Sequence, residues 1–138
     1  DGDMFTDPEQ AIDFIQQTGI DVCALSFGSS HGIMPEGYVP EFHCDIVEKV
    51  KKATGIPLVL HGGSGCGAEN IQASVKAGIN KINVGSDVMH AQANALQEQF
   101  ARNPERDYVE IMATTLEPAK EVVKEYIKIS GSAEKSVM

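Results

Sequence analysis

Short apolar runs alternate along the chain with longer segments in which apolar residues recur every three or four positions. The run at 22–27 is almost wholly apolar, which is typical of a strand in a parallel sheet that is covered on both faces. Residues 56–60 and 79–84 are predicted to be the second and third strands. The longer segments predict helices with one apolar face. We place these helices at 8–18, 42–53, 68–77, 88–101, 107–112 and 118–129.

Helix boundaries are marked by residues with known capping roles. Asp7 has the short carboxylate that suits an N-cap, and Pro8 after it suits the first helical position. Glycine follows three of the predicted helices, at Gly19, Gly55 and Gly78. Glycine is the residue most often found where a helix ends in a left-handed conformation.

Strands that alternate with helices imply a parallel sheet with right-handed crossovers. Three strands are too few for a complete sheet of this class, because they leave open edges and bury little core. A closed eight-stranded barrel of this type needs about 250 residues. The chain also begins at a helix without an initiator methionine. We therefore expect residues 1–138 to be the C-terminal portion of one larger α/β domain.

The composition is that of an ordinary globular protein, with 42% hydrophobic and 22% charged residues. No apolar run approaches the ~18 residues of a membrane span, and the first residues do not form a signal peptide. Three cysteines, with no C-x-x-C pair, indicate reduced thiols in a cytoplasmic protein.

The net charge of -9 argues against nucleic acid as a partner. Residues 1–48 contain no Lys or Arg, whereas all eleven bases lie in residues 49–138. This acidic stretch is either a solvated face or a surface that meets basic residues outside this chain.

Polar side chains follow each predicted strand where it ends, and strand C-termini of a parallel barrel converge on one face. His31 and His61 come after two neighbouring strands, and each precedes a glycine. Neutral imidazole is a good zinc ligand, and the glycine leaves room for a substrate near the metal. A lone histidine is more often a hydrogen-bonded structural residue, but two such pairs in parallel positions favour a metal site.

The segment Gly62-Gly63-Ser64-Gly65 precedes a predicted helix. Backbone N–H groups of a glycine loop next to a helix N-terminus form an anion site. A second predicted loop, at 85–87, begins with Gly85-Ser86 after the next strand, in the region where barrels often bind phosphate. Both loops could instead be tight turns without a ligand.

Three blocks of sequence resemble the class II, metal-dependent fructose- and tagatose-bisphosphate aldolases. They are residues 18–32, residues 58–87 with the motifs LVLHGGSG and GINKINVGSD, and residues 118–133. The resemblance covers nearly the whole chain, in the order and spacing of that family. It implies the C-terminal part of a TIM (β/α)8 barrel, about three βα units plus closing helices.

The resemblance also implies a set of site residues. His31 and His61 match two of the three zinc-binding histidines. Other positions match the family's substrate site, in which the phosphate group of the substrate is bound beside a monovalent cation such as Na⁺ or K⁺. These positions are Gly32, Gly62, Gly63, Ser64, Asn83, Gly85, Ser86 and Asp87. The family's third histidine and its catalytic aspartate lie upstream, so this chain is expected to contain no catalytic residue and to be inactive alone.

The function implied is reversible cleavage of a ketose phosphate, foremost fructose 1,6-bisphosphate, into dihydroxyacetone phosphate and an aldehyde such as glyceraldehyde 3-phosphate. Zinc would polarise the ketone as a Lewis acid. The resemblance further implies a cytoplasmic enzyme of glycolysis, a phosphorylated sugar as partner, and a homodimer or homotetramer.

Two departures from the family pattern leave the substrate open. No lysine occurs in residues 31–36, and no arginine in residues 88–91, where relatives place groups that meet phosphate. A sugar with one phosphate or an unusual binding mode is therefore also compatible with the sequence. The resemblance itself leaves tagatose bisphosphate or another ketose phosphate as a further alternative. So are a metal-free isomerase or synthase of the same fold and a non-catalytic half-barrel fragment.

Several side chains outside these motifs are assigned structural roles or are left with two interpretations. Lys81 shares strand parity with Asn83 and forms either a buried ion pair or a Schiff base. Cys66 is either a small loop residue or an oxidisable thiol. His43 and His90 are expected to be surface or structural residues. The lysines at 120, 124 and 128 share a helix face that meets either solvent or another subunit.

Overall fold

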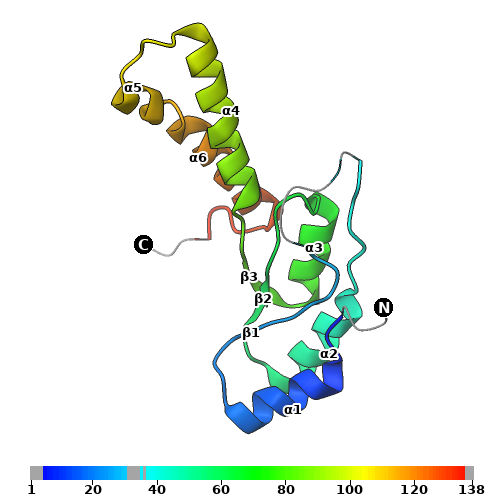
Figure 1. Cartoon of the computed structure of the whole chain (residues 1–138). Coiled ribbons are helices and arrows are strands. Elements are labelled where there is room, and N and C mark those ends of the chain that lie inside the picture. Colours follow the sequence, from blue (N-terminus) through cyan, green and yellow to red (C-terminus); the bar gives the residue numbers. More distant parts are fainter. Residues whose placement is uncertain (1–4, 31–34, 36, 136–138) are drawn as a thin grey trace. The chain divides into compact units, whose positions relative to one another are not determined.

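The computed structural model describes residues 5–30, 35 and 37–135 (Figure 1). The chain divides into two compact units, which we call unit 1 (Asp1–Val84) and unit 2 (Gly85–Met138). Unit 1 contains α1 (Pro8–Thr18), β1 (Cys23–Ala24), α2 (Cys44–Thr54), β2 (Leu58–Leu60), α3 (Ala68–Ala77) and β3 (Ile79–Ile82). Unit 2 contains α4 (Ser86–Arg102), α5 (Tyr108–Ala113) and α6 (Leu116–Ile129).

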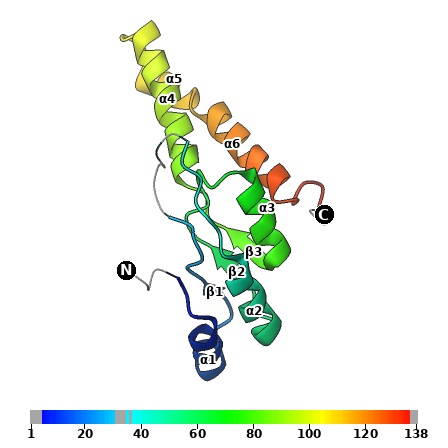
Figure 2. The ribbon, with the colours of Figure 1, turned by 90° about the vertical axis from the view of Figure 1, so that its right-hand side faces the viewer.

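The three strands of unit 1 form a parallel sheet in the order β1-β2-β3, which is also their order along the chain. This confirms the predicted α/β class with parallel strands. Leu58, Val59 and Leu60 of β2 are all buried, as expected for a central strand that is covered on both faces. Helix α1 packs against α2, and α2 packs against α3 (Figure 2).

The predicted boundaries of α1 are confirmed in detail. Asp7 Oδ1 accepts hydrogen bonds from the backbone N–H groups of Glu9 and Gln10, at 2.8 and 3.2 Å. Gly19 ends the helix with φ of 63°, and its N–H donates to the carbonyl of Ile15 at 3.0 Å. The local capping signals therefore fix both ends of this helix.

Strand β1 is shorter than the predicted run 22–27. Beyond Ala24, the backbone of Ser26 pairs with Thr6 instead of with β2. Ser26 N–H donates to Thr6 Oγ1 at 2.8 Å, and Thr6 N–H donates to the Ser26 carbonyl at 2.7 Å. The side chains of Leu25 and Phe27 are nevertheless buried, so the apolar run marks a core segment more reliably than it marks a strand.

An irregularity in the pairing of β2 with β3 leaves Asn80 outside the ladder of paired residues. Its side-chain oxygen compensates by accepting from the backbone N–H of Leu58 at 3.3 Å. The same oxygen accepts from Lys51 Nζ at 2.9 Å, and Lys51 also donates to the carbonyl of Ile56 at 2.8 Å. Asn80 and Lys51 thereby tie the end of α2 to the start of β3.

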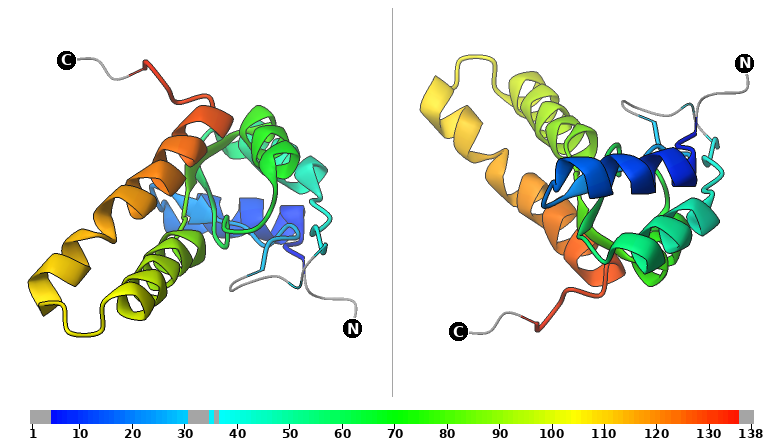
Figure 3. Two further views of the ribbon diagram at one scale, coloured as in Figure 1. Left: turned by 90° about the horizontal axis from the view of Figure 1, so that it is seen from above. Right: turned by 90° about the horizontal axis from the view of Figure 1, so that it is seen from below.

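In unit 2, α4 packs mainly against α6, and the two helices run side by side (Figure 3). Ile111 and Thr115 are its most deeply buried side chains among the described residues. The prediction of a loop at 85–87 is wrong, because α4 begins at Ser86 and Gly85 is its N-cap. Asp87 in the first turn has a negative charge that favours the helix N-terminus. No described helix combines the length and apolarity that crossing a bilayer requires.

All three cysteines are free, and burial raises the pKa of the Cys23 and Cys44 thiols above the ordinary value of 9.0. The nearby carboxylates of Glu48 and Asp45 raise the pKa of Cys44 further.

The irregular strand pair predicts a specific loss of stability in the variant Asn80→Ala. This change removes the amide oxygen that accepts hydrogen bonds from the Leu58 N–H and the Lys51 ammonium. The free energy of unfolding, measured by urea denaturation, should therefore fall by about 1–2 kcal/mol. Asn80→Asp retains an acceptor oxygen and should stay close to the parent protein. Asn94→Ala, on the exposed face of α4, is the matched control and should change stability by less than about 0.5 kcal/mol. Equal losses in all three variants would contradict this assignment.

Thiol labelling is expected to depend on pH. The thiolate is the reactive form, and a raised pKa makes it scarcer near neutral pH. Cys44 in the native protein should therefore react with a disulfide reagent more slowly than a free cysteine near neutrality, and its rate should still be rising at pH values where that of a free cysteine has levelled off. A rate at neutral pH equal to that of a free thiol would show that burial and the carboxylates do not act on Cys44.

Candidate active site

The first part of the candidate site is the loop that follows β2. His61 comes directly after Leu60 and is exposed at the end of the strand. Gly62, Gly65 and Gly67 have φ angles of 66°, 71° and 81°. Residues with side chains rarely adopt this left-handed region, so the path of the loop depends on glycine at these three positions.

Gly63 brings this loop into direct contact with the end of β3. Its N–H donates to the carbonyl of Asn83 at 3.0 Å, and the N–H of Asn83 donates to the carbonyl of Leu60 at 2.9 Å. A Cβ atom on Gly63 would lie 2.7 Å from Cγ2 of Ile82, which is closer than side chains pack. The loop therefore rests on β3 only because residue 63 has no side chain.

The side chain of Asn83 connects β3 to His61. Its amide nitrogen lies 3.1 Å from Nε2 and 3.4 Å from Nδ1 of the His61 ring. Its amide oxygen accepts a hydrogen bond from the ammonium of Lys81. Because an ammonium group only donates, Lys81 fixes which end of the amide is the oxygen and directs the NH₂ group toward His61.

Lys81 and Asn83 lie on the same side of the strand, as their parity predicts. The predicted buried ion pair of Lys81 is wrong, because Lys81 is exposed and its partner is an amide.

Ser64 and Cys66 belong to this loop, and their side chains are buried. Ser64 is 4% exposed and Cys66 is fully buried. The Cys66 thiol donates to the carbonyl of Gly62 at 3.0 Å and thus closes the turn from inside. Burial and this hydrogen bond favour the interpretation of Cys66 as a structural loop residue.

Unit 2 contains the other predicted substrate-binding residues, at the start of α4. The carbonyl of Gly85 accepts a hydrogen bond from Met89 N–H at 3.0 Å, and Ser86 and Asp87 form the first turn. The carboxylate of Asp87 accepts a hydrogen bond from the hydroxyl of Tyr126 at 2.6 Å. Sequence reasoning missed Tyr126, since it lies on α6 and no pattern along the chain pairs it with Asp87.

His31 and Gly32 lie outside the described residues, so the pairing of His31 with His61 as metal ligands stays a prediction. The described part of the chain holds no group of three His, Cys, Asp or Glu side chains arranged to bind a metal. The chemistry of His61 nevertheless fits zinc, because imidazole nitrogen is a common zinc ligand and His61 is exposed at a strand end. His43 packs its ring on Phe5 at 4.3 Å, and His90 is exposed on α4, which agrees with their predicted surface or structural roles.

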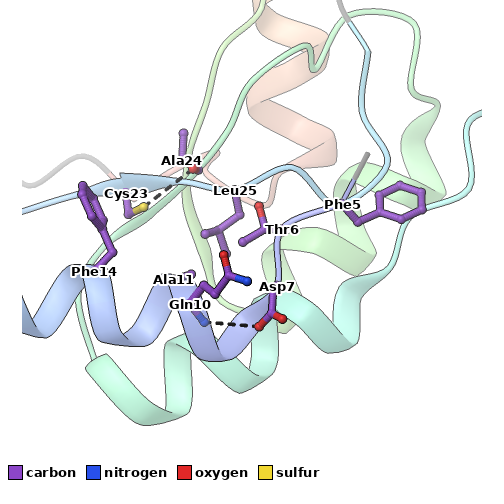
Figure 4. A pocket seen from close by; sticks show the side chains of 9 residues that line it. All are labelled: Phe5, Thr6, Asp7, Gln10, Ala11, Phe14, Cys23, Ala24 and Leu25. Atoms are coloured by element: carbon purple, nitrogen blue, oxygen red, sulfur yellow. Dashed lines mark hydrogen bonds between the residues drawn. The ribbon is translucent and has the colours of Figure 1, made fainter. Parts of the chain in front are cut away.

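A separate hollow of about 680 Å³ lies between the start of α1 and β1 (Figure 4). Its walls are Phe5, Thr6, Asp7, Gln10, Ala11, Phe14, Cys23, Ala24 and Leu25. The carboxylate among them, that of Asp7, caps α1. None of the predicted site residues is among these walls. We therefore place the candidate site at the strand ends, where several polar groups converge.

The arrangement at the strand ends has two chemical capabilities. Imidazole and amide groups meet above β2 and β3, which suits binding of a metal or a polarised oxygen. The glycine loop and the start of α4 are each backbone segments of the kind that bind anions through main-chain N–H groups, although the N–H of Gly63 already donates to Asn83.

Comparison with known proteins identifies relatives of this chain. The sequence model described as "Fructose-bisphosphate aldolase class-II" matches residues 1–135. The uncharacterized protein YdjI of Escherichia coli K12 is 33% identical over 131 residues, a match that covers 95% of this chain and 45% of YdjI.

Solved structures give the same relationship. The crystal structure of the YdjI aldolase from Escherichia coli K12 has a TM-score of 0.82 and 32% identity, covering 96% of this chain and 48% of that chain. A fructose-bisphosphate aldolase from Campylobacter jejuni has a TM-score of 0.73 at 23% identity, over 93% of this chain and 46% of that chain, and this likeness concerns the fold alone. The chain thus spans about half the length of the relatives it matches.

The contact between Gly63 and β3 predicts that Gly63→Ala displaces the loop. The added Cβ should lower the free energy of unfolding by about 1–3 kcal/mol, because either Ile82 or the loop must move. Urea denaturation measures this loss. Gly85→Ala is the matched control for stability, since its Cβ would meet only Met89 Cε at 3.9 Å. A Gly63→Ala variant as stable as Gly85→Ala would show that the close approach is not constraining.

Proposed function

Because this chain belongs to the class-II fructose-bisphosphate aldolase family, we propose that it carries the phosphate-binding half of a metal-dependent aldolase. The reaction is the reversible cleavage of a ketose phosphate, foremost fructose 1,6-bisphosphate, into dihydroxyacetone phosphate and an aldehyde such as glyceraldehyde 3-phosphate. The observation that carries this proposal is the contact of Asn83 with His61 directly above the glycine loop. It brings a candidate metal ligand, a polar amide and a candidate anion site together at the ends of two strands.

In this proposal, residues 1–138 form the C-terminal portion of a single (β/α)8 barrel domain. Strand order that follows chain order supports it, because neighbouring strands of such a barrel are consecutive in sequence. The site residues after β2 and β3 also lie at the C-terminal ends of the strands, where barrel enzymes place their active sites.

We assign the metal to His61 and His31, together with a third ligand outside this chain. Zinc bound there would supply Lewis-acid polarisation of the substrate ketone. The amide of Asn83, held by Lys81, orients the ketone and its adjacent hydroxyl. Because the amide oxygen is already engaged by Lys81, Asn83 presents its NH₂ group as a donor.

The phosphate of the substrate is assigned to two sets of backbone groups. The first is the loop with Gly62, Gly63 and Ser64, in which Gly63 shapes the backbone, because its own N–H donates to the carbonyl of Asn83. Gly32 and a Na⁺ or K⁺ ion would contribute to this set. The second is the start of α4 with Gly85 and Ser86. Each set would bind phosphate oxygens through main-chain N–H groups, and a bound phosphate would keep the reacting carbons aligned. Asp87 accepts a hydrogen bond from a substrate hydroxyl.

The base that moves the proton is assigned to an aspartate outside this chain, as the family pattern implies. The chain alone is therefore proposed to be inactive, and the intact protein is proposed to act as a homo-oligomer on a phosphorylated sugar. Tagatose bisphosphate or another ketose phosphate is the alternative substrate. Among these, a ketose with one phosphate is supported by the absence of arginine from residues 88–91.

Metal removal is the first test of this function. The intact protein should cleave fructose 1,6-bisphosphate or another ketose phosphate in a coupled assay, lose this activity in EDTA and regain it with zinc. His61→Ala should lower kcat/KM by at least about 100-fold, because it removes a metal ligand. His90→Ala, on the exposed face of α4, should leave kcat/KM unchanged.

Two outcomes would contradict the proposal. Activity that survives EDTA and is trapped by borohydride would indicate a Schiff base, for which Lys81 is the candidate. Isomerase activity without bound metal would indicate that the histidines act in acid–base chemistry.

A further inference from the structure

A hydrogen bond between Asp87 and Tyr126 joins a candidate substrate-binding residue to a distant element of unit 2. Tyr126 lies on α6, and its hydroxyl donates to Oδ2 of Asp87 at 2.6 Å across the packed helices α4 and α6. This distance lies in the range of O–H···O⁻ bonds to an ionised acceptor, which are stronger than neutral ones.

The contact restrains the carboxylate in a way that local sequence does not. A phenol ring has two side-chain torsions and moves as a rigid body, and both Asp87 and Tyr126 are half-buried. Holding Oδ2 selects one rotamer of Asp87 and sets the direction of its second oxygen. Without Tyr126, the short Asp87 side chain at the second position of α4 is able to turn back and accept from backbone N–H groups of the first turn.

This rotation of the Asp87 side chain would matter because the first helical turn of α4 is assigned to binding of the phosphate. A carboxylate folded onto those N–H groups would compete with the phosphate for donors and repel its charge. A carboxylate oxygen that accepts from Tyr126 is engaged by the phenol, which weakens its competition for these donors.

We propose that Tyr126 is a positioning residue that holds the carboxylate of Asp87 so that it accepts a hydroxyl of the sugar instead of occupying the first turn of α4. The inference rests on the proposed function, since it concerns the same substrate. It adds a residue of α6 to the determinants of substrate affinity and explains how an acidic residue is tolerated beside a phosphate site.

The test is Tyr126→Phe in the intact, zinc-loaded protein, with the ring retained and only the hydroxyl removed. The KM for the ketose phosphate should rise about tenfold, with kcat within about twofold, because a hydroxyl away from the reacting carbons is bound equally in the ground and transition states. Tyr108→Phe, which removes an exposed hydroxyl on α5, is the matched control and should leave KM unchanged.

A double-mutant cycle separates positioning from a general structural role. In the Asp87→Asn background, Tyr126→Phe should change KM by less than about twofold, because the group through which it acts is already altered. Additive effects on KM would overturn the proposal, as would an unchanged KM in Tyr126→Phe alone. Unfolding curves of the four proteins, measured in parallel, report the strength of the hydrogen bond without substrate.

The proposed function and this inference fail in different ways. An active wild-type protein whose KM does not respond to Tyr126→Phe overturns the role of Tyr126 only. A wild-type protein that cleaves no ketose phosphate overturns the proposed function, and the substrate role of Tyr126 falls with it, even where the unfolding cycle shows the two side chains to be coupled.

Discussion

The close approach of Gly63 to the end of β3 is the contact on which the candidate site depends. The loop after β2 has room there only because residue 63 has no Cβ, and a hydrogen bond of 3.0 Å to the carbonyl of Asn83 holds it in place. As a result, the side chains of His61 and Asn83 meet within hydrogen-bond distance. A backbone constraint thus places the side chains, and the side chains then determine what the site binds.

A second level of order comes from side chains that orient other side chains. Lys81 fixes the amide of Asn83, and Asn83 in turn meets His61. In unit 2, Tyr126 holds Asp87 in the same manner. Each of these contacts leaves a short polar group with fewer orientations, which is how a binding site limits the entropy lost when a substrate arrives.

Features that depend on neighbouring residues were predictable from the sequence, and those that depend on distant pairings were not. The cap at Asp7, the glycine stop at Gly19 and the full length of α3 follow from local rules, and the structure agrees with them. By contrast, the apolar run 22–27 leaves the sheet after Ala24 because Ser26 pairs with Thr6. The bond between Tyr126 and Asp87 joins residues 39 positions apart. Apolar periodicity records burial and contains no information on which polar groups meet across a fold.

The binding of metal and phosphate at the strand ends is best tested by a crystal structure of the intact protein with zinc and dihydroxyacetone phosphate, with data collected at the zinc absorption edge. We predict an anomalous peak bonded to a ring nitrogen of His61, and a phosphate bound by backbone N–H groups of Gly62, Ser64, Gly85 or Ser86, with the N–H of Gly63 still donating to Asn83. A zinc peak away from His61, or a phosphate bound away from the glycine loop and from the start of α4, would contradict this placement.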